Sequence, residues 1–166
     1  MRVLVVIMGV AGSGKSTVGA ALARRTGLVF LDADDWHDPD DLVRMSRGTP
    51  LSDEDRQGWL DRLNQLLRRH RDEGAVLACS ALSAWSRARL TDGLDDVRFV
   101  LLRGAPDLIR ERLRLRQGHP VGPSLLPSQL RTLDPPNHAL EVDVANPPEV
   151  IVDQIVAWLE DGSHGI

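Results

Sequence analysis

One stretch of eight residues constrains the fold more than any other part of this chain. Residues 9–16 read Gly-Val-Ala-Gly-Ser-Gly-Lys-Ser and fit the pattern G-x-x-x-x-G-K-[ST] at every fixed position. They follow a continuously apolar run, residues 3–8, and precede a helical pattern that begins at Thr17. A buried strand, a glycine loop and a helix in this order form a phosphate-binding loop (P-loop), because the N–H groups of the loop and the helix N-terminus point at one anion.

Two side chains of this loop have specific tasks in nucleotide binding. Lys15 is placed to reach the β- and γ-phosphates, and the Ser16 hydroxyl is placed to coordinate a Mg²⁺ ion that keeps most of its waters. The alternative is a glycine turn that binds nothing. Composition favours phosphate binding, because Lys15 is the one lysine among 20 Lys and Arg residues. A planar guanidinium would not replace its compact charge, so the sequence predicts a site for a nucleoside triphosphate with Mg²⁺.

Composition and length exclude several classes of protein. The 166 residues suit one domain, and the formal net charge of −4 argues against broad binding of nucleic acid. Cys79 is the one cysteine, so an intramolecular disulfide is excluded. No segment approaches the roughly 18 apolar residues of a membrane span, and the apolar N-terminal run leads directly into the glycine loop. We expect a cytoplasmic protein with no nucleic-acid or membrane partner.

The order of the predicted elements defines the fold class. Five strands alternate with helical patterns along the chain, and the P-loop follows the first strand; the strands are expected at residues 3–8, 28–31, 75–79, 97–102 and 140–144. This alternation predicts an α/β fold of the P-loop NTPase type. Its doubly wound, five-stranded parallel sheet has helices on both faces, and its last strand lies at or near an edge. We expect a single domain over residues 1–166 with a small lid at approximately residues 113–127.

An acidic cluster follows the second predicted strand. Residues 32–37 read Asp-Ala-Asp-Asp-Trp-His, and they stand where open α/β sheets place their ligands. One carboxylate there, with Asp34 favoured, can accept a proton from a substrate hydroxyl, and another, Asp32, can hold magnesium through water. The alternative is a solvated turn that caps a helix.

Two arginines stand out from a chain that is rich in arginine. Arg56 falls in the first turn of a predicted helix, after the N-cap Ser52, where a cation opposes the helix dipole. Arg116 precedes a loop rich in glycine and proline, residues 117–123, of the kind that forms a lid. An arginine at the base of a lid can stabilise charge on a transferring phosphoryl group, although a solvated helix face would also explain it.

Three functional classes fit a P-loop of this kind: a small-molecule kinase, a GTPase-type switch and a non-catalytic nucleotide-binding module. A switch needs an N-K-x-D guanine motif, which a chain with one lysine at position 15 cannot contain. A non-catalytic module gives no reason for the acidic cluster and the arginine beside the lid. A kinase accounts for the P-loop, the acidic cluster and the arginine beside the lid.

The ordered motifs of the chain resemble those of the gluconokinases. Besides residues 9–16 and 32–37, the resemblance rests on Met45 with residues 48–51, on 53–56 with 59–60, on 79–82 with Arg87, on 116–119, and on 128–130 with 132–133. The set covers most of the chain. Its order separates the gluconokinases well from shikimate and adenylate kinases, whereas each block outside the P-loop is weak alone.

The resemblance implies transfer of the γ-phosphoryl group of ATP to the 6-hydroxyl of D-gluconate, in a P-loop kinase fold with a closing lid. It implies that Ser16 coordinates magnesium, that Asp34 orients or deprotonates the hydroxyl, and that Arg116 is the lid arginine. It also implies a homodimer. The residues expected to hold ATP are Gly9, Val10, Ala11, Gly12, Ser13, Gly14, Lys15, Ser16 and Thr17; those expected to hold the polyol and its carboxylate are Asp34, His37, Arg56, Arg87 and His119. A kinase of a related polyol or sugar derivative, or a nucleotide-binding protein without catalysis, is the alternative.

Several positions depart from the family pattern. Ser83 stands where the family usually has lysine, and Ser86 stands where it has an aromatic residue. Asp38 and Asp41 replace a proline and an asparagine, and Pro120 replaces an aromatic residue. These changes predict a less positive acceptor side than is usual in the family.

Overall fold

The computed structural model describes residues 1–49, 51–116 and 122–162 and contains one parallel sheet. The strands are β1 (Leu4–Met8), β2 (Val29–Asp32), β3 (Ala75–Ala78), β4 (Val97–Arg103) and β5 (Leu140–Asp143). Their order across the sheet is β2-β3-β1-β4-β5, and every neighbouring pair is parallel. The predicted five-stranded parallel sheet, with its last strand at an edge, is confirmed.

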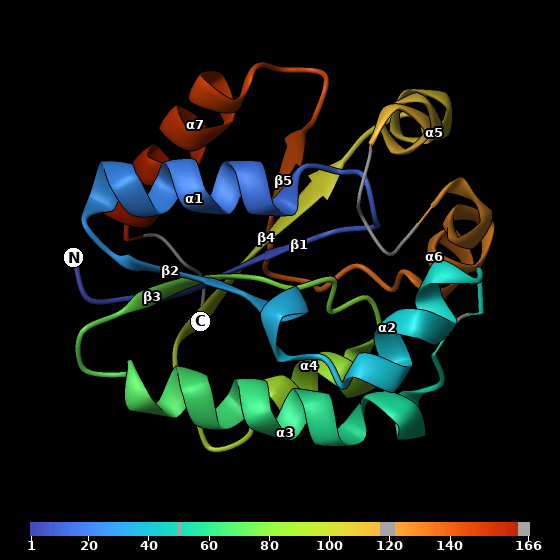
Figure 1. The fold of residues 1–166 in the computed structure, drawn as a ribbon. Helices are drawn as coiled ribbons and strands as arrows, with labels where there is room; N and C mark the ends of the chain where they lie inside the picture. The colour runs from blue at the N-terminus through green and yellow to red at the C-terminus, as the bar shows by residue number, and fades with distance from the viewer. Residues whose placement is uncertain (50, 117–121, 163–166) are drawn as a thin grey trace.

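Helices cover both faces of the sheet, as predicted. Figure 1 shows α1 and α7 on one face and α3 and α4 on the other. The helices are α1 (Lys15–Thr26), α2 (Pro39–Ser46), α3 (Asp53–Arg69), α4 (Ala84–Leu90), α5 (Pro106–Leu115), α6 (Leu126–Thr132) and α7 (Pro148–Glu160), with short 3₁₀ turns η1 (Ala33–Trp36) and η2 (Pro123–Leu125). Within these described segments, no helix combines the length and the apolar character that crossing a bilayer would require.

The two faces of the central strand belong to two separate apolar clusters. Val6 and Met8 of β1 pack with leucines of α3, whereas Val5 and Ile7 pack with residues of α1 and α7. All five residues of β1 are buried, which explains why this strand reads as continuously apolar rather than alternating. The rigid sheet therefore fixes the place where β1 ends and the P-loop begins.

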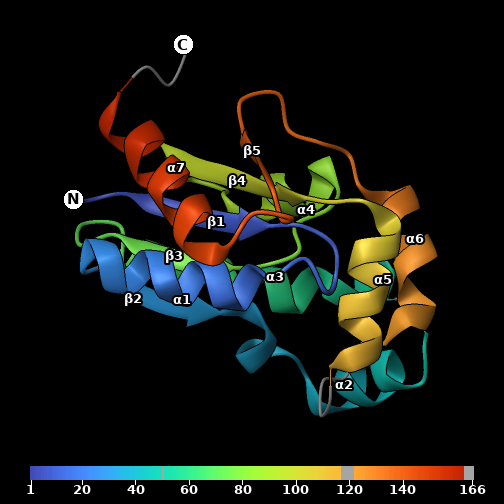
Figure 2. The same ribbon diagram turned by 90° about the horizontal axis from the view of Figure 1, so that it is seen from above.

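A third apolar cluster holds the P-loop against the helices beyond the sheet. Val10 and Ala11 pack there with residues of α5, η2 and α6. Figure 2 shows α5, α6 and α2 grouped at the same end of the molecule, past the carboxyl ends of the strands. The predicted lid, residues 113–127, falls in this region, but its centre, residues 117–121, lies outside the described residues.

The first helix starts two residues earlier than the sequence pattern indicated. Thr17 was the expected first residue, whereas α1 begins at Lys15. Gly14 acts as the N-cap in a left-handed conformation, with φ of 97°, which turns the chain directly from the loop into the helix. Lys15 and Ser16 consequently lie in the first helical turn.

Candidate active site

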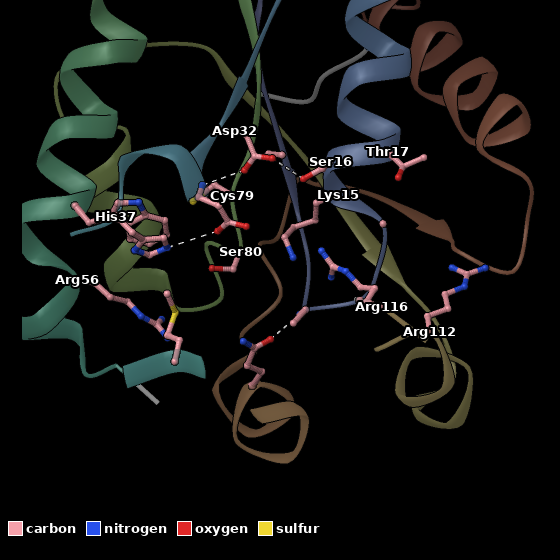
Figure 3. Close-up of a pocket in the computed structure, with 18 residues that line it drawn as sticks. Lys15, Ser16, Thr17, Asp32, His37, Arg56, Cys79, Ser80, Arg112 and Arg116 are labelled. Atoms are coloured by element: carbon pink, nitrogen blue, oxygen red, sulfur yellow. Dashed lines mark hydrogen bonds and ion pairs between the residues drawn. The ribbon is translucent and has the colours of Figure 1, made fainter. Parts of the chain in front are cut away.

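A cavity of about 300 Å³ lies at the carboxyl ends of β1, β2 and β3. Figure 3 shows Lys15 and Arg116 facing each other on one side of it and His37 with Arg56 on the other. The predicted site residues that line the cavity are Ala11, Gly12, Gly14, Lys15, Ser16, Thr17, Asp32, Asp34, His37, Arg56 and Arg116. Gly9, Val10 and Ser13 belong to the loop without lining the cavity, and His119 lies outside the described residues.

The P-loop is closely packed where it turns. A Cβ atom on Gly12 would lie 2.6 Å from Leu113 Cγ of α5, and the φ of Gly12 is +81°. Glycine is therefore required there both by space and by backbone conformation. The Ser13 hydroxyl is buried, and no described group hydrogen-bonds it. A buried polar atom without a partner in a glycine-rich turn suits a loop that is completed by a phosphate ligand.

Lys15 is folded back onto the loop that carries it. Its Nζ donates a hydrogen bond to the Val10 carbonyl oxygen at 3.0 Å. Burial lowers the pKa of Lys15 from 10.5 to about 8, and attraction to the Asp34 carboxylate opposes that shift. The lysine is thus a partly buried cation with its amine at the cradle, where a phosphate group would restore its usual preference for the charged form.

Ser16 and Asp32 meet across the gap between α1 and β2. The Ser16 hydroxyl donates to Asp32 Oδ2 at 2.7 Å, and the other carboxylate oxygen of Asp32 accepts the Asp34 N–H at 3.0 Å. Asp32 is the last residue of β2 and the N-cap of η1. Two hard oxygen donors beside a phosphate cradle are the protein ligands that Mg²⁺ prefers, so the chemistry of this pair fits the expected ion.

A stack of aromatic rings forms the wall opposite the P-loop. The Trp59 indole N–H donates to the Ala33 carbonyl oxygen at 2.8 Å, and the His37 ring lies on the indole with centroids 4.1 Å apart. His37 Nε2 is 3.6 Å from Asp34 Oδ1. His37 Nδ1 is buried and has no hydrogen-bond partner among the described residues. The stack fixes where the imidazole lies beside the Asp34 carboxylate.

Arg56 extends into the cavity from the start of α3. Ser52 and Asp55 cap this helix reciprocally: the Asp55 N–H donates to Ser52 Oγ at 3.2 Å, and the Ser52 N–H donates to Asp55 Oδ2 at 3.1 Å. Arg44 of α2 also donates to Asp55 at 3.2 Å, and this hydrogen bond lowers the pKa of Asp55. The predicted cap is confirmed, and Arg56 follows it on a helix end that is tied to α2.

Arg87 occupies a different place from the one expected. It does not line the cavity; its Nη1 donates to the carbonyl oxygens of Ala81 at 2.9 Å and Leu82 at 3.0 Å. Burial lowers its pKa. Ala81 has a φ of 46°, which is costly for a residue with a side chain. Arg87 therefore braces the strained turn after β3 instead of facing a ligand in the cavity.

Two arginines at the C-terminal end of α5 line the cavity. Arg116 is the C-cap of α5, and Arg112, one turn earlier, also lines the cavity. Arg112 Nη2 donates to the Val144 carbonyl oxygen at 2.8 Å and so ties α5 to the segment after β5. Arg116 thus stands at the base of the expected lid with its guanidinium directed toward Lys15 (Figure 3).

Sequence reasoning missed seven residues that line the cavity: Met45, Trp59, Ala78, Cys79, Ser80, Arg112 and Gln129. Trp59 is also a core residue of its helix, with 4% of its surface exposed. Gln129 stands in one of the ordered motifs, and that was the one signal for it. Cys79 lines the cavity too, and burial raises its pKa to about 12, so it remains a neutral thiol.

The sheet order, the P-loop and the cavity that faces acidic and basic side chains define a P-loop kinase. Comparison with known proteins agrees: a family described as an AAA domain matches residues 4–136. The phosphate-accepting partner of such an enzyme is a small molecule with an alcohol group.

Similar proteins narrow this class. The gluconokinase of Gluconobacter oxydans (strain 621H) is 38% identical over 156 residues, which cover 91% of this chain and 88% of that protein. The thermoresistant gluconokinase of Escherichia coli (strain K12) is 34% identical over 163 residues, which cover 95% and 93%. This chain belongs to the gluconokinase family.

Solved structures agree in fold. A sugar kinase from Janibacter sp. HTCC2649 matches with a TM-score of 0.90 and 38% identity, over 96% of this chain and 95% of that one. A gluconokinase from Sinorhizobium meliloti 1021 matches with a TM-score of 0.84 and 38% identity, over 96% and 93%.

Proposed function

We propose that this enzyme transfers the γ-phosphoryl group of ATP to the 6-hydroxyl of D-gluconate, which gives 6-phospho-D-gluconate and ADP. One observation carries the proposal: Lys15 and Ser16 of the P-loop share a single cavity with Asp34 and Arg56. A triphosphate and an anionic polyol therefore fit side by side. The similarity to gluconokinases supports the choice of acceptor.

The reaction needs a base and a concentration of positive charge. The oxygen of the 6-hydroxyl forms a bond to the γ-phosphorus, the bond from that phosphorus to the bridging oxygen of ADP breaks, and the hydroxyl proton passes to the Asp34 carboxylate. Lys15 and Arg116 stabilise the charge on the transferring group. Arg56 binds the carboxylate of the sugar acid, and His37 binds its hydroxyls. His119 remains a predicted ligand of the acceptor.

Magnesium fits the oxygen pair formed by Ser16 and Asp32. When bound, the ion neutralises charge on the β- and γ-phosphates. Ser16 would hold it directly, and Asp32 would hold it through a coordinated water. Ser16→Ala should raise the Mg²⁺ concentration needed for half-maximal rate, and an unchanged Mg²⁺ requirement would argue against this arrangement.

A coupled assay of ADP release tests the proposed function directly. Purified enzyme is given ATP and Mg²⁺ with D-gluconate, related aldonic acids, shikimate, neutral polyols or no acceptor. Turnover with D-gluconate well above all others supports the proposal. Turnover with another acceptor would identify a kinase of a related sugar derivative, and no acceptor-dependent turnover would identify a nucleotide-binding protein without this catalysis; either result overturns it.

Substitution of Arg56 tests how the acceptor is bound. Arg56→Ala should raise KM for gluconate by about tenfold to a hundredfold, the usual cost of a lost hydrogen bond between charged groups, with a much smaller change in KM for ATP. Arg69→Ala is the matched control, because Arg69 is an exposed residue in the last turn of the same helix and does not line the cavity. Equal changes in both KM values would contradict the assignment.

Substitution of Asp34 should slow the chemical step and leave ATP binding almost unchanged. Asp34→Asn keeps the size of the side chain and removes its basicity, so kcat should fall by about a hundredfold to ten-thousandfold. KM for ATP should change little, since the P-loop is intact. A kcat within a few-fold of the wild-type value would exclude Asp34 as the base, and a single-turnover measurement of phosphoryl transfer would establish which step limits.

The family resemblance also suggests a homodimer. Light scattering of the purified protein in line with size exclusion tests this, and the mass of one 18.3 kDa chain would contradict it. The expected lack of binding to nucleic acid or membranes stays a prediction.

A further inference from the structure

Gln129 joins α6 to the P-loop inside the cavity. Its side-chain oxygen, Oε1, accepts a hydrogen bond from the Ala11 N–H at 2.6 Å, across 118 positions of sequence. Gln129 also lines the cavity, together with Lys15 and Arg56. Neither the proposed phosphoryl transfer nor the proposed binding of magnesium uses its side chain.

This hydrogen bond determines how the amide group is turned. A backbone N–H requires an acceptor, so the oxygen of the amide must face Ala11, and the NH₂ group occupies the other branch. Among the hydrogen bonds of the described residues, Gln129 Nε2 donates none. Some side-chain atoms of the described residues are buried and lack a hydrogen-bond partner, and Gln129 Nε2 is not one of them. Two oriented donors are therefore available to a ligand in the cavity.

The packing of α6 indicates which half of the cavity these donors serve. Met45, near the end of α2, packs against the cluster that contains Leu125 and Leu126. A Cβ atom on Gly48 would lie 2.9 Å from Ser124 Oγ. Figures 1 and 2 both show α6 next to α2. Gln129 therefore comes from a helix whose start lies beside α2, and it shares the cavity with Arg56 of α3, the residue proposed to bind the acceptor.

We propose that Gln129 is an acceptor-binding residue, whose Nε2 donates to an oxygen of the sugar acid while its Oε1 is held by the P-loop. This inference rests on the proposed function. Hydroxyl and carboxylate oxygens of the acceptor accept hydrogen bonds, and the opposite wall supplies donors from Arg56 and His37. The bond to Ala11 gives the contact a second effect: it fixes the acceptor relative to the loop that holds the phosphoryl group, which favours the in-line geometry that transfer needs.

The competing explanation is that Gln129 only holds the P-loop in place. Gln129→Glu separates the two, because a carboxylate still accepts the Ala11 N–H but has no hydrogen to donate and repels an anionic acceptor. A purely structural role leaves only the effect of the added charge, which lies on the P-loop and should raise KM for ATP at least as much as KM for gluconate. Acceptor binding predicts a rise in KM for gluconate of about tenfold or more that clearly exceeds any rise in KM for ATP.

A second variant removes the effect of added charge. Gln129→Met is neutral and similar in length, and it loses both the acceptor and the donors. It should also raise KM for gluconate by about tenfold, and thermal unfolding with and without ATP reports whether its P-loop still binds nucleotide. Gln57→Glu is the matched control, because it makes the same chemical change at an exposed position beside Arg56 that does not line the cavity.

The outcomes separate this inference from the proposed function. Wild-type turnover with gluconate, together with an unchanged KM for gluconate in Gln129→Glu, overturns the role of Gln129 alone. A larger rise in KM for ATP than for gluconate in both variants does the same and places Gln129 with the nucleotide. Absence of gluconate-dependent turnover in the wild type instead removes the proposed function, and the inference with it.

Discussion

Raising the pH should weaken ATP binding through one group, Lys15. Burial brings its pKa from 10.5 to about 8 in the free enzyme, which corresponds to about 3 kcal/mol in favour of the neutral amine. Above pH 8, ATP must bind to an enzyme that first recovers this proton. The apparent affinity for ATP should therefore fall by about tenfold for each pH unit between about 8 and 10.

The same shift has a consequence for stability, and its sign follows from proton counting. Between the folded pKa of about 8 and the unfolded value of 10.5, the unfolded chain binds more protons than the folded one. The free energy of unfolding without ligand should therefore rise with pH across this window, by about 3 kcal/mol from Lys15. Saturating ATP should cancel this rise, because the tenfold loss of ATP affinity per pH unit removes as much stability as the unliganded protein gains.

The composition of the chain allows the pKa of Lys15 to be measured directly. Lys15 is the one lysine, so protein grown with ¹³C-labelled lysine gives a single Cε resonance whose titration reports this pKa alone. The alkaline limb of kcat/KM for ATP should have the same midpoint. Lys15→Arg is the control, since a guanidinium does not titrate in this range and its residual activity should lack that limb. A resonance that titrates near 10.5, or a flat profile to pH 10, would refute the reasoning.

Two further changes test packing around the site. Gly12→Ala should cost about 1–3 kcal/mol of unfolding free energy and weaken ATP binding, because its Cβ would lie 2.6 Å from Leu113 Cγ; Gly14→Ala meets nothing within 4 Å and should cost only the strain of its positive φ, about 1–2 kcal/mol. Denaturant unfolding and ATP titration check both, and equal effects would contradict the steric argument. Arg87→Gln should lower unfolding free energy by about 1–3 kcal/mol through the two carbonyls it leaves without a charged donor, and should lower kcat through the turn at Ala81, whereas a change in KM for gluconate alone would restore Arg87 as a ligand.

The nucleotide half of the site was predictable because it is local in sequence. The strand, the glycine loop, Lys15 and Ser16 are contiguous, so one short stretch contains both the fold signal and the ligand signal. Asp32 and Asp34 could be added because parallel strands bring their carboxyl ends to one edge of a sheet. The bond between Ser16 and Asp32 is the direct result of that rule.

The acceptor half was less predictable because its residues come from distant segments. Arg87 belongs to a family motif. The two carbonyl oxygens that it binds belong to Ala81 and Leu82, in a turn where Ala81 has a left-handed conformation. Nothing in the local sequence requires that turn. Gln129 presents the opposite case: its contact with Ala11 depends on the packing of α6 against the P-loop, which no periodicity in either segment reveals.

Two residues that depart from the family pattern interact with each other. Ser83 and Ser86 replace a lysine and an aromatic residue, and together they form the reciprocal cap of α4. The Ser86 N–H donates to Ser83 Oγ at 3.1 Å, and the Ser83 N–H donates to Ser86 Oγ at 3.2 Å. Neither residue lines the cavity. The lost lysine is therefore replaced by a stabilised helix start, directly before the helix that carries Arg87.

The two additional acids near the acceptor side are also used locally. Asp38 caps α2 by accepting the Asp40 N–H at 2.9 Å, and Asp41 Oδ1 lies 3.7 Å from Arg44 Nη1. Both are absent from the described lining of the cavity, in which Arg56 is the arginine of the acceptor side. The sequence predicted a less positive acceptor side because it counted these two carboxylates. The effect of a carboxylate on a ligand depends on where it lies, and these two do not line the cavity. Helix capping and a neighbouring arginine engage these carboxylates, so the cavity keeps a cation for an anionic acceptor without having gained carboxylates from these two substitutions.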